Sequence, residues 1–105
     1  MPRLRIAVVL GSESDWPVME LCVKQLRAFG ENAHVEVMSA HRSPRRVHEF
    51  AAGAEAAGFE VIIAAAGMSA ALAGTIAANT VLPVIGVPLE GGAMGGLDAL
   101  LSTVQ

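Results

Sequence analysis

The residues best suited to chemistry in this sequence stand in two short polar segments, 11–15 and 39–43. In the second segment, Ser39 is followed closely by the adjacent pair His41 and Arg42. Histidine is the side chain whose proton equilibrium lies nearest neutral pH, and arginine carries a permanent planar charge that suits a phosphate or a carboxylate. We therefore identify His41 as a candidate acid–base residue; a hydrogen-bonded structural histidine is the alternative.

The first segment combines Gly11 with the hydroxyl groups of Ser12 and Ser14 at the expected start of a helix. Backbone N–H groups at such a helix start favour a phosphate. A carboxylate would repel the phosphate, and we therefore assign Asp15 to sugar hydroxyl groups beside it. The alternative is that Ser14 and Asp15 only cap the helix.

These polar segments follow strands of one expected sheet. Apolar runs predict buried strands at 4–10, 61–66 and 84–87, and an alternating pattern at 33–38 indicates one wet face or an edge position. Apolar residues at helical spacing predict three helices between the strands and a fourth after the last strand. They run from Ser14 or Asp15 to Gly30, from Ser43 to Gly58, from Ser69 to Asn79 and from Leu97 to Val104.

Strands that alternate with helices at this spacing predict a parallel sheet. We therefore expect residues 1–105 to form a single α/β domain, a three-layer sandwich of the flavodoxin type. Folds of this type usually have five strands, whereas only four are predicted here. A fifth strand is expected to be missing, and the chain is expected to be truncated at its C-terminal end.

In an open parallel sheet, ligands bind outside the carboxyl ends of the strands. The polar and glycine-rich residues of this sequence gather after those ends, whereas the turns at the opposite edge are plainer. Gly67 and Ser69 follow the third strand, and they join Gly11, Ser12 and Ser39 as candidate ligand-binding residues.

The charge balance narrows the class of ligand. The net charge is −3, which leaves no broad basic surface for a nucleic acid. The positive charge is concentrated in Arg42, Arg45 and Arg46, a cluster that suits a small anionic ligand; a solvated helix start is the alternative. No apolar run reaches the roughly 20 residues of a membrane span.

The single cysteine, Cys22, excludes an internal disulfide, fits a reducing cytoplasm, and falls on the apolar stripe of a helix as a packing residue. No Cys/His cluster has the spacing of a metal site, and no dinucleotide or phosphate-loop fingerprint is present. Hydrophobic residues make up 53% of the chain but aromatics only 4%, which favours closely packed elements or subunits. The residues alone therefore predict a binder of a small phosphorylated molecule, without metal or cofactor.

Three segments, 11–15, 39–44 and 82–88, together resemble the N5-carboxyaminoimidazole ribonucleotide mutase family of purine biosynthesis, and residues 96–105 extend the likeness. The likeness covers nearly the whole chain. It implies an isomerase that needs no metal or cofactor and moves a carboxylate from the exocyclic amine of its substrate to the adjacent ring carbon.

The resemblance also implies roles for individual residues. His41 matches the general acid–base residue of the family, and Ser12, Asp15 and Arg42 match its substrate-binding residues. The expected partner is a small phosphorylated ribonucleotide, with no nucleic acid or membrane. The family forms homo-octamers with active sites near the subunit contacts, and we expect a cytoplasmic homo-oligomer here.

Two departures from the family pattern stand out. The third loop of the family often carries a histidine where this chain has Ala71, so that His41 lacks a second imidazole nearby. The family also continues beyond Gln105 into a further strand and at least one long helix. Without these elements, apolar surface and a sheet edge are expected to be left uncovered.

Two other functions remain open at this point. The first is direct carboxylation of aminoimidazole ribonucleotide by free carbon dioxide, on the same fold. The second is a ribonucleotide-binding fragment without catalysis, which Ala71 and the short C-terminal end would suit. Segments 39–44 and 82–88 are more like the mutase branch, which we therefore favour.

Overall fold

The computed structural model describes residues 4–67 and 71–89, and within them four strands alternate with helices. In chain order the elements are β1 (Ile6–Leu10), the short 3-10 helix η1 (Glu13–Asp15), α1 (Trp16–Ala28), β2 (Ala33–Val37), α2 (Pro44–Gly53), β3 (Val61–Gly67), α3 (Leu72–Ala77) and β4 (Val84–Leu89). This order confirms the α/β class that the sequence predicted. The predicted glycine-rich loop 90–96 and the predicted helix after it lie outside the described residues.

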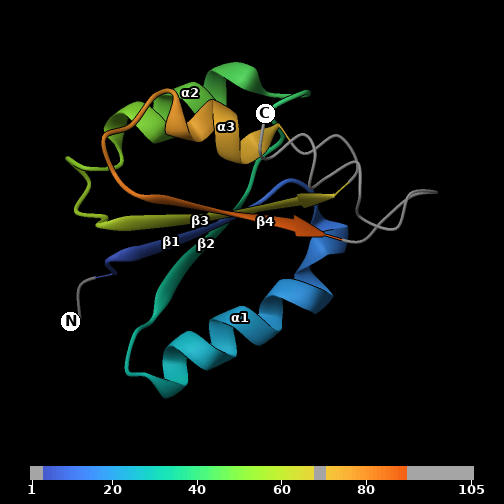
Figure 1. The fold of residues 1–105 in the computed structure, drawn as a ribbon, viewed down its shortest axis with the longest axis vertical. Helices are drawn as coiled ribbons and strands as arrows, with labels where there is room; N and C mark the ends of the chain where they lie inside the picture. The colour runs from blue at the N-terminus through green and yellow to red at the C-terminus, as the bar shows by residue number, and fades with distance from the viewer. Residues whose placement is uncertain (1–3, 68–70, 90–105) are drawn as a thin grey trace.

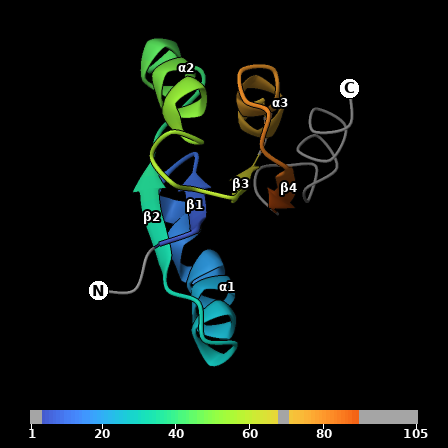
Figure 2. The same ribbon diagram turned by 90° about the vertical axis from the view of Figure 1, so that its left-hand side faces the viewer.

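The four strands form one parallel sheet in the order β2-β1-β3-β4. This is the order of the first four strands of a flavodoxin-type sheet. Helix α1 lies on one face of the sheet, and helices α2 and α3 lie on the other, so that the molecule has three layers (Figures 1 and 2). The predicted three-layer architecture is confirmed for the described residues.

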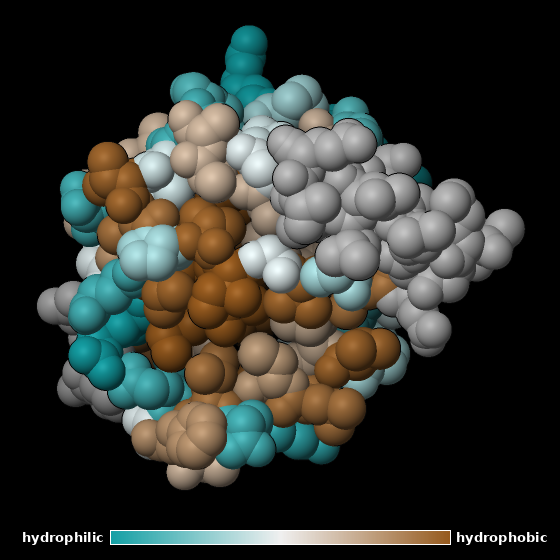
Figure 3. All heavy atoms as spheres, viewed as in Figure 1, coloured by the Kyte–Doolittle hydropathy of each residue, from teal (hydrophilic) through white to brown (hydrophobic). Residues whose placement is uncertain are grey.

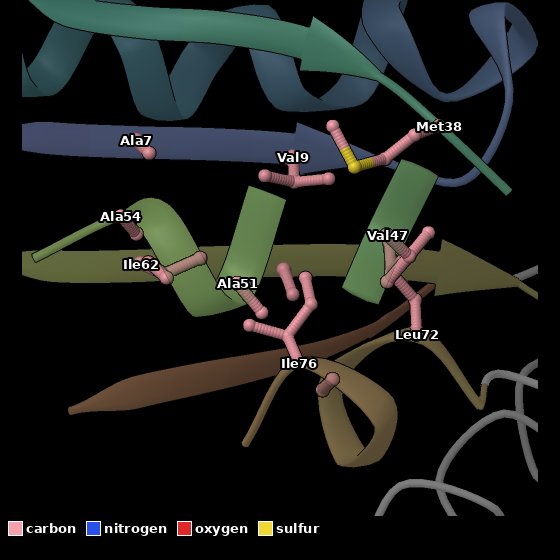
Figure 4. Packing of buried hydrophobic residues seen from close by; sticks show 11 residues of the cluster. Ala7, Val9, Met38, Val47, Ala51, Ala54, Ile62, Leu72 and Ile76 are labelled. Atoms are coloured by element: carbon pink, nitrogen blue, oxygen red, sulfur yellow. The ribbon is translucent and has the colours of Figure 1, made fainter. Parts of the chain in front are cut away.

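The core is divided by the sheet into two apolar clusters, one on each face. On the face of α2 and α3, Val9 and Ile62 point from the sheet toward Val47 of α2 and Ile76 of α3 (Figure 4). Strands β1 and β3 occupy the centre of the sheet, which explains why their sequences are continuous apolar runs. The alternating strand β2 lies at an edge of the sheet, as its pattern predicted.

Helix α1 is followed by Gly30, which has φ +90°, a conformation that glycine adopts without strain. Helix α2 differs from the prediction, because it ends at Gly53 instead of continuing to Gly58. The chain continues in turns whose N–H groups bond three or four residues back, for example Gly58 to the carbonyl of Glu55 at 3.0 Å. Gly58 itself has φ +101° and ends these turns.

Helix α3 is shorter than predicted, Leu72–Ala77, although residues 69 and 70 lie outside the described part. At its C-terminal end the Asn79 side chain donates to the carbonyl of Thr75 at 2.8 Å. A side chain that occupies a backbone carbonyl in this way replaces the next bond of the helix.

Hydrophobic side chains are visible on the face of the molecule that Figure 3 shows. Large apolar side chains that are exposed include Val81 and Ile85, near and in β4, and Val18 and Leu21 on α1. Helix α1 packs mainly on β1 and β2, and no other described helix lies on its face of the sheet (Figure 2). That this apolar surface is uncovered for want of further C-terminal elements stays a prediction.

The two sides of this sheet should respond differently to the same substitution. Ile62→Ala removes a side chain that is 0% exposed, and we expect the free energy of unfolding to fall by about 2–5 kcal/mol. Ile85→Ala, the matched control on a strand of the same sheet, removes a side chain that is 53% exposed and should cost less than about 1 kcal/mol. Denaturant unfolding of both variants measures the difference, and equal losses would contradict the assigned core.

Candidate functional site

A pocket of about 520 Å³ lies at the carboxyl edge of the sheet, between the loop that follows β1 and the loop that follows β2. Four of the candidate residues from the sequence line it: Gly11, Ser12, Ser39 and Arg42. The other lining residues are Glu13, Val37, Met38, Ser43 and Arg46. The structure thus brings the two polar segments of the sequence to one hollow.

Gly11 is required by the close approach of the first loop to β3. Its N–H donates to the carbonyl of Ala65 at 2.9 Å, which draws the loop across the end of that strand. A Cβ atom placed on Gly11 would lie 3.0 Å from the Cβ of Ala66, closer than side chains normally pack. The Met38 N–H donates to the carbonyl of Leu10 at 2.8 Å, and so both loops are tied to the sheet beside the pocket.

Ser12 and Asp15 form a reciprocal capping pair around η1. The Ser12 hydroxyl accepts from the backbone N–H of Ser14 at 3.3 Å, and the Asp15 carboxylate accepts from the backbone N–H of Ser12 at 3.1 Å. Ser12 is therefore the N-cap, and Asp15 makes no side-chain cap on α1. The alternative from the sequence was that Ser14 and Asp15 cap the long helix; in the structure the side-chain capping belongs to η1, with Ser12 as its N-cap and Asp15 as the partner.

The capping pair gives Asp15 an unusual electrostatic setting. Burial raises the pKa of the Asp15 carboxyl above its ordinary value of 3.8, and the Ser12 N–H opposes this effect by favouring the charged form. Asp15 does not line the pocket. The proposed contact between Asp15 and sugar hydroxyl groups stays a prediction.

The second loop is folded by Ser39. Its hydroxyl oxygen accepts the backbone N–H groups of both His41 and Arg42, each at 3.2 Å, and its carbonyl accepts the N–H of Ser43 at 2.8 Å. These bonds turn the chain so that Arg42 reaches the pocket and Pro44 starts α2. The His41 and Arg42 residues are both exposed at this turn.

The remaining candidates are less closely grouped. His41 is next to Arg42 in the chain but does not line the pocket. Gly67 ends β3 beside Leu89 of β4, also away from the pocket lining, and Ser69 lies outside the described residues. Ala71, where the family often has histidine, is the N-cap of α3 and is half-buried.

Sequence reasoning placed Arg46 in a basic cluster but did not identify it as a pocket residue. Its Nη2 lies 3.2 Å from Oε2 of Glu36 on β2. The contact depends on how α2 crosses the sheet edge, which spacing along the chain does not show. The signal that could have found it is its place in the first turn of a helix that begins beside a ligand-binding loop.

Over residues 4–67 and 71–89, no three His, Cys, Asp or Glu side chains come together in a manner that could hold a metal ion. Cys22 is half-buried on α1, and burial raises the pKa of its thiol. This fits the predicted packing role, because a raised pKa disfavours the reactive thiolate. Nor is any helix in these ranges long and apolar enough to cross a membrane.

Comparison with known proteins shows the family of this chain. The model of the family described as AIR carboxylase matches residues 5–105. The chain belongs to this family. The resemblance to the N5-carboxyaminoimidazole ribonucleotide mutases that segments 11–15, 39–44 and 82–88 indicated is thereby confirmed at the level of the family.

Proteins named N5-carboxyaminoimidazole ribonucleotide mutase are close relatives. The one from Pyrococcus abyssi is 50% identical over 105 residues, which are 100% of this chain and 59% of the relative. That of Mycobacterium tuberculosis H37Rv is 52% identical over 98% of this chain and 59% of its own length, and that of Escherichia coli K12 is 48% identical over 96% and 60%. The chain thus spans about three fifths of the curated relatives it matches.

A solved structure supports the same assignment. The crystal structure of Treponema denticola PurE superposes with a TM-score of 0.85 at 26% identity, over 95% of this chain and 63% of that one. The four-stranded parallel sheet described above is therefore the PurE fold over the matched region.

The close contact at Gly11 yields a stability prediction. Gly11→Ala should lower the free energy of unfolding by about 1–3 kcal/mol, because the new methyl group meets Ala66 on a central strand. Gly53→Ala is the matched control: a Cβ there meets nothing within 4 Å, and the change should raise stability by about 0.5–1 kcal/mol. Chemical denaturation of the two variants tests this, and a stable Gly11→Ala chain would disprove the tight approach.

The raised pKa of Asp15 yields a pH prediction. The folded chain holds the Asp15 proton more tightly than the unfolded chain, so this group adds stability at pH below 3.8 that is lost as pH rises through its higher folded pKa. Asp15→Asn removes this loss, and its amide oxygen can still accept the Ser12 N–H. The stability of the variant relative to the parent should therefore increase as pH rises from 3.8 through the higher pKa that Asp15 has in the folded chain. Unfolding curves across that range measure it, and a constant difference would contradict the assigned shift.

Proposed function

We propose that this chain carries the active-site loops of an N5-carboxyaminoimidazole ribonucleotide mutase, which converts its substrate to 4-carboxy-5-aminoimidazole ribonucleotide in purine biosynthesis. The observation that carries the proposal is the joining of the two polar segments at one pocket, with Ser12 and Arg42 in its lining. The curated relatives at about 50% identity that carry this name support the choice of reaction.

The pocket supplies groups suited to the ribose phosphate of such a substrate. Arg42 lines it and makes no ion pair within the described part of the chain, so that its planar charge is available to an anion. Ser12 and Ser43 add hydroxyl groups on the two sides. This arrangement would fix the phosphate end and leave the imidazole ring to extend toward the turn that carries His41.

In the proposed reaction, the bond between the exocyclic nitrogen and its carboxylate breaks, carbon dioxide is released, and His41 protonates the nitrogen. The ring carbon next to it then attacks the retained carbon dioxide, and His41 recovers the ring proton, which restores the aromatic ring. One imidazole can serve both steps, because the ring that has donated a proton is a base that can then recover one. No metal or cofactor takes part, and Gly67 and Ser69 would border the substrate from the third loop.

Direct carboxylation of aminoimidazole ribonucleotide is the second candidate, since the matching family model is described as AIR carboxylase. The relatives cited above are named mutases, which favours the first. An assay with both substrates distinguishes the two: activity that needs added bicarbonate and is absent with the carboxylated substrate would establish the carboxylase. Binding without any turnover would instead establish a non-catalytic module.

We further propose that the working protein is a cytoplasmic homo-oligomer, an octamer as the family resemblance implies. The apolar side chains left exposed near β4 and on α1 support association of some kind, because exposed apolar area is unfavourable in water. Sedimentation velocity measures the assembly directly, and a stable monomer at assay concentration would exclude the octamer.

The role of His41 yields a catalytic prediction. His41→Asn should reduce kcat by at least about a hundredfold, the usual contribution of a positioned acid–base group, while ribonucleotide binding changes little. His48→Asn is the matched control, because His48 is exposed on α2 and does not line the pocket. Ultraviolet absorbance follows the conversion of the carboxylated substrate, and retained turnover in His41→Asn would overturn the catalytic assignment.

A further inference from the structure

Arg46 is a second arginine in the lining of the pocket, on the opposite side of Ser43 from Arg42 in the chain. It belongs to the first turn of α2, whereas Arg42 belongs to the loop that precedes the helix. The two arginines therefore line the same pocket from different local structures. Glu13 also lines the pocket, and a single arginine would only balance its negative charge.

Arg46 is anchored from the edge strand of the sheet. Oε2 of Glu36 accepts from Nη2 of Arg46 at 3.2 Å, and Oε1 of the same carboxylate lies 2.7 Å from Nε2 of His34. The ring of His34 in turn packs against Phe59, with centroids 5.5 Å apart. A chain of contacts thus runs from an apolar support through His34 and Glu36 to Arg46 at the pocket.

The anchor leaves most of the arginine available. A guanidinium group has five N–H donors in a fixed fork, and the bond to Glu36 uses one of them. The Arg46 side chain is 57% exposed, and Arg46 lines the pocket. Holding one corner of the group restricts the side chain and reduces the entropy that it would lose on binding an anion.

We propose that Arg46 is a second phosphate-binding residue of the pocket and that Glu36 is a positioning residue that holds it there. The ligand class is a phosphate monoester, contacted by Arg42 from the loop and by Arg46 from α2. This rests on the proposed function, in which the ligand is a ribonucleotide, and it adds a recognition residue that the loop motifs do not contain.

The simpler account is a surface ion pair between Arg46 and Glu36 that has no contact with a ligand. Exposed pairs of this kind are common and contribute little to stability. The two accounts differ in one measurable respect, because only a phosphate contact makes ligand affinity depend on Arg46.

The test measures the binding of ribose 5-phosphate to the full chain by titration calorimetry, with ribose as the reference ligand. Arg46→Ala should weaken the binding of ribose 5-phosphate by roughly tenfold to a hundredfold, the effect of losing a charge-assisted contact, and leave that of ribose unchanged. Arg46→Lys should fall between this variant and the parent, because the charge remains without the fork. Arg45→Ala is the matched control; it removes the same charge from the adjacent helix position, outside the pocket lining.

Glu36→Gln tests the positioning role. If Glu36 only competes with the ligand for Arg46, loss of its charge tightens phosphate binding. If it positions Arg46, loss of its charge weakens binding, and we expect a weakening of about threefold to tenfold. The thermal midpoint of the variant, measured beside the parent, shows that the fold is retained. Unchanged or tighter binding by Glu36→Gln overturns the positioning role.

Parent-like affinity of Arg46→Ala overturns the phosphate contact, and so does a loss of affinity in Arg45→Ala as large as that in Arg46→Ala. The phosphate contact is also overturned if the parent chain binds ribose with the same affinity as ribose 5-phosphate. None of these binding results depends on turnover, so the mutase proposal is decided separately by the His41→Asn assay.

Discussion

The pocket depends on the reversal of strand order at β1. From β1 the chain moves outward to β2 and then crosses back to β3 on the other side, so the first two loops meet over the carboxyl edge. The meeting is possible only because Gly11 passes close to Ala66 at the end of β3. A larger residue would lift the loop off the sheet and separate Ser12 from the second loop. The absence of a Cβ atom at Gly11 therefore governs the geometry of the polar site.

The charged side chains near the pocket carry both signs. The chain as a whole is acidic, yet Arg42 and Arg46 line one pocket. Two nearby acidic side chains accept hydrogen bonds from local groups. Asp15 accepts the backbone of Ser12, and Glu36 accepts from Arg46. Two of the carboxylates near the site are thus bound to local donors, whereas Glu13 lines the pocket itself beside the two arginines.

Much of the fold could be predicted from the sequence, because buried positions are occupied by apolar residues at the spacing of the helix or strand that carries them. The central strands appeared as apolar runs, and the edge strand β2 appeared as an alternating one. Helix ends were less predictable: α2 ends at Gly53 because turns of mixed hydrogen bonding follow it, which no spacing rule reveals. The loops were predictable as ligand-binding segments, but Arg46 was not, because its contact with Glu36 joins elements that are adjacent only in space.

The hydroxyl of Ser39 has a consequence for the chemistry that the pocket accepts. A serine oxygen has two lone pairs, and the N–H groups of His41 and Arg42 occupy both. What remains to offer a ligand is the hydroxyl hydrogen alone. The Ser39 hydroxyl can therefore donate a hydrogen bond to a ligand but cannot accept one. It favours a ligand oxygen that carries lone pairs over an amine or hydroxyl group that needs an acceptor. A turn that shapes the backbone has thus also fixed the polarity of a side chain, in favour of anions.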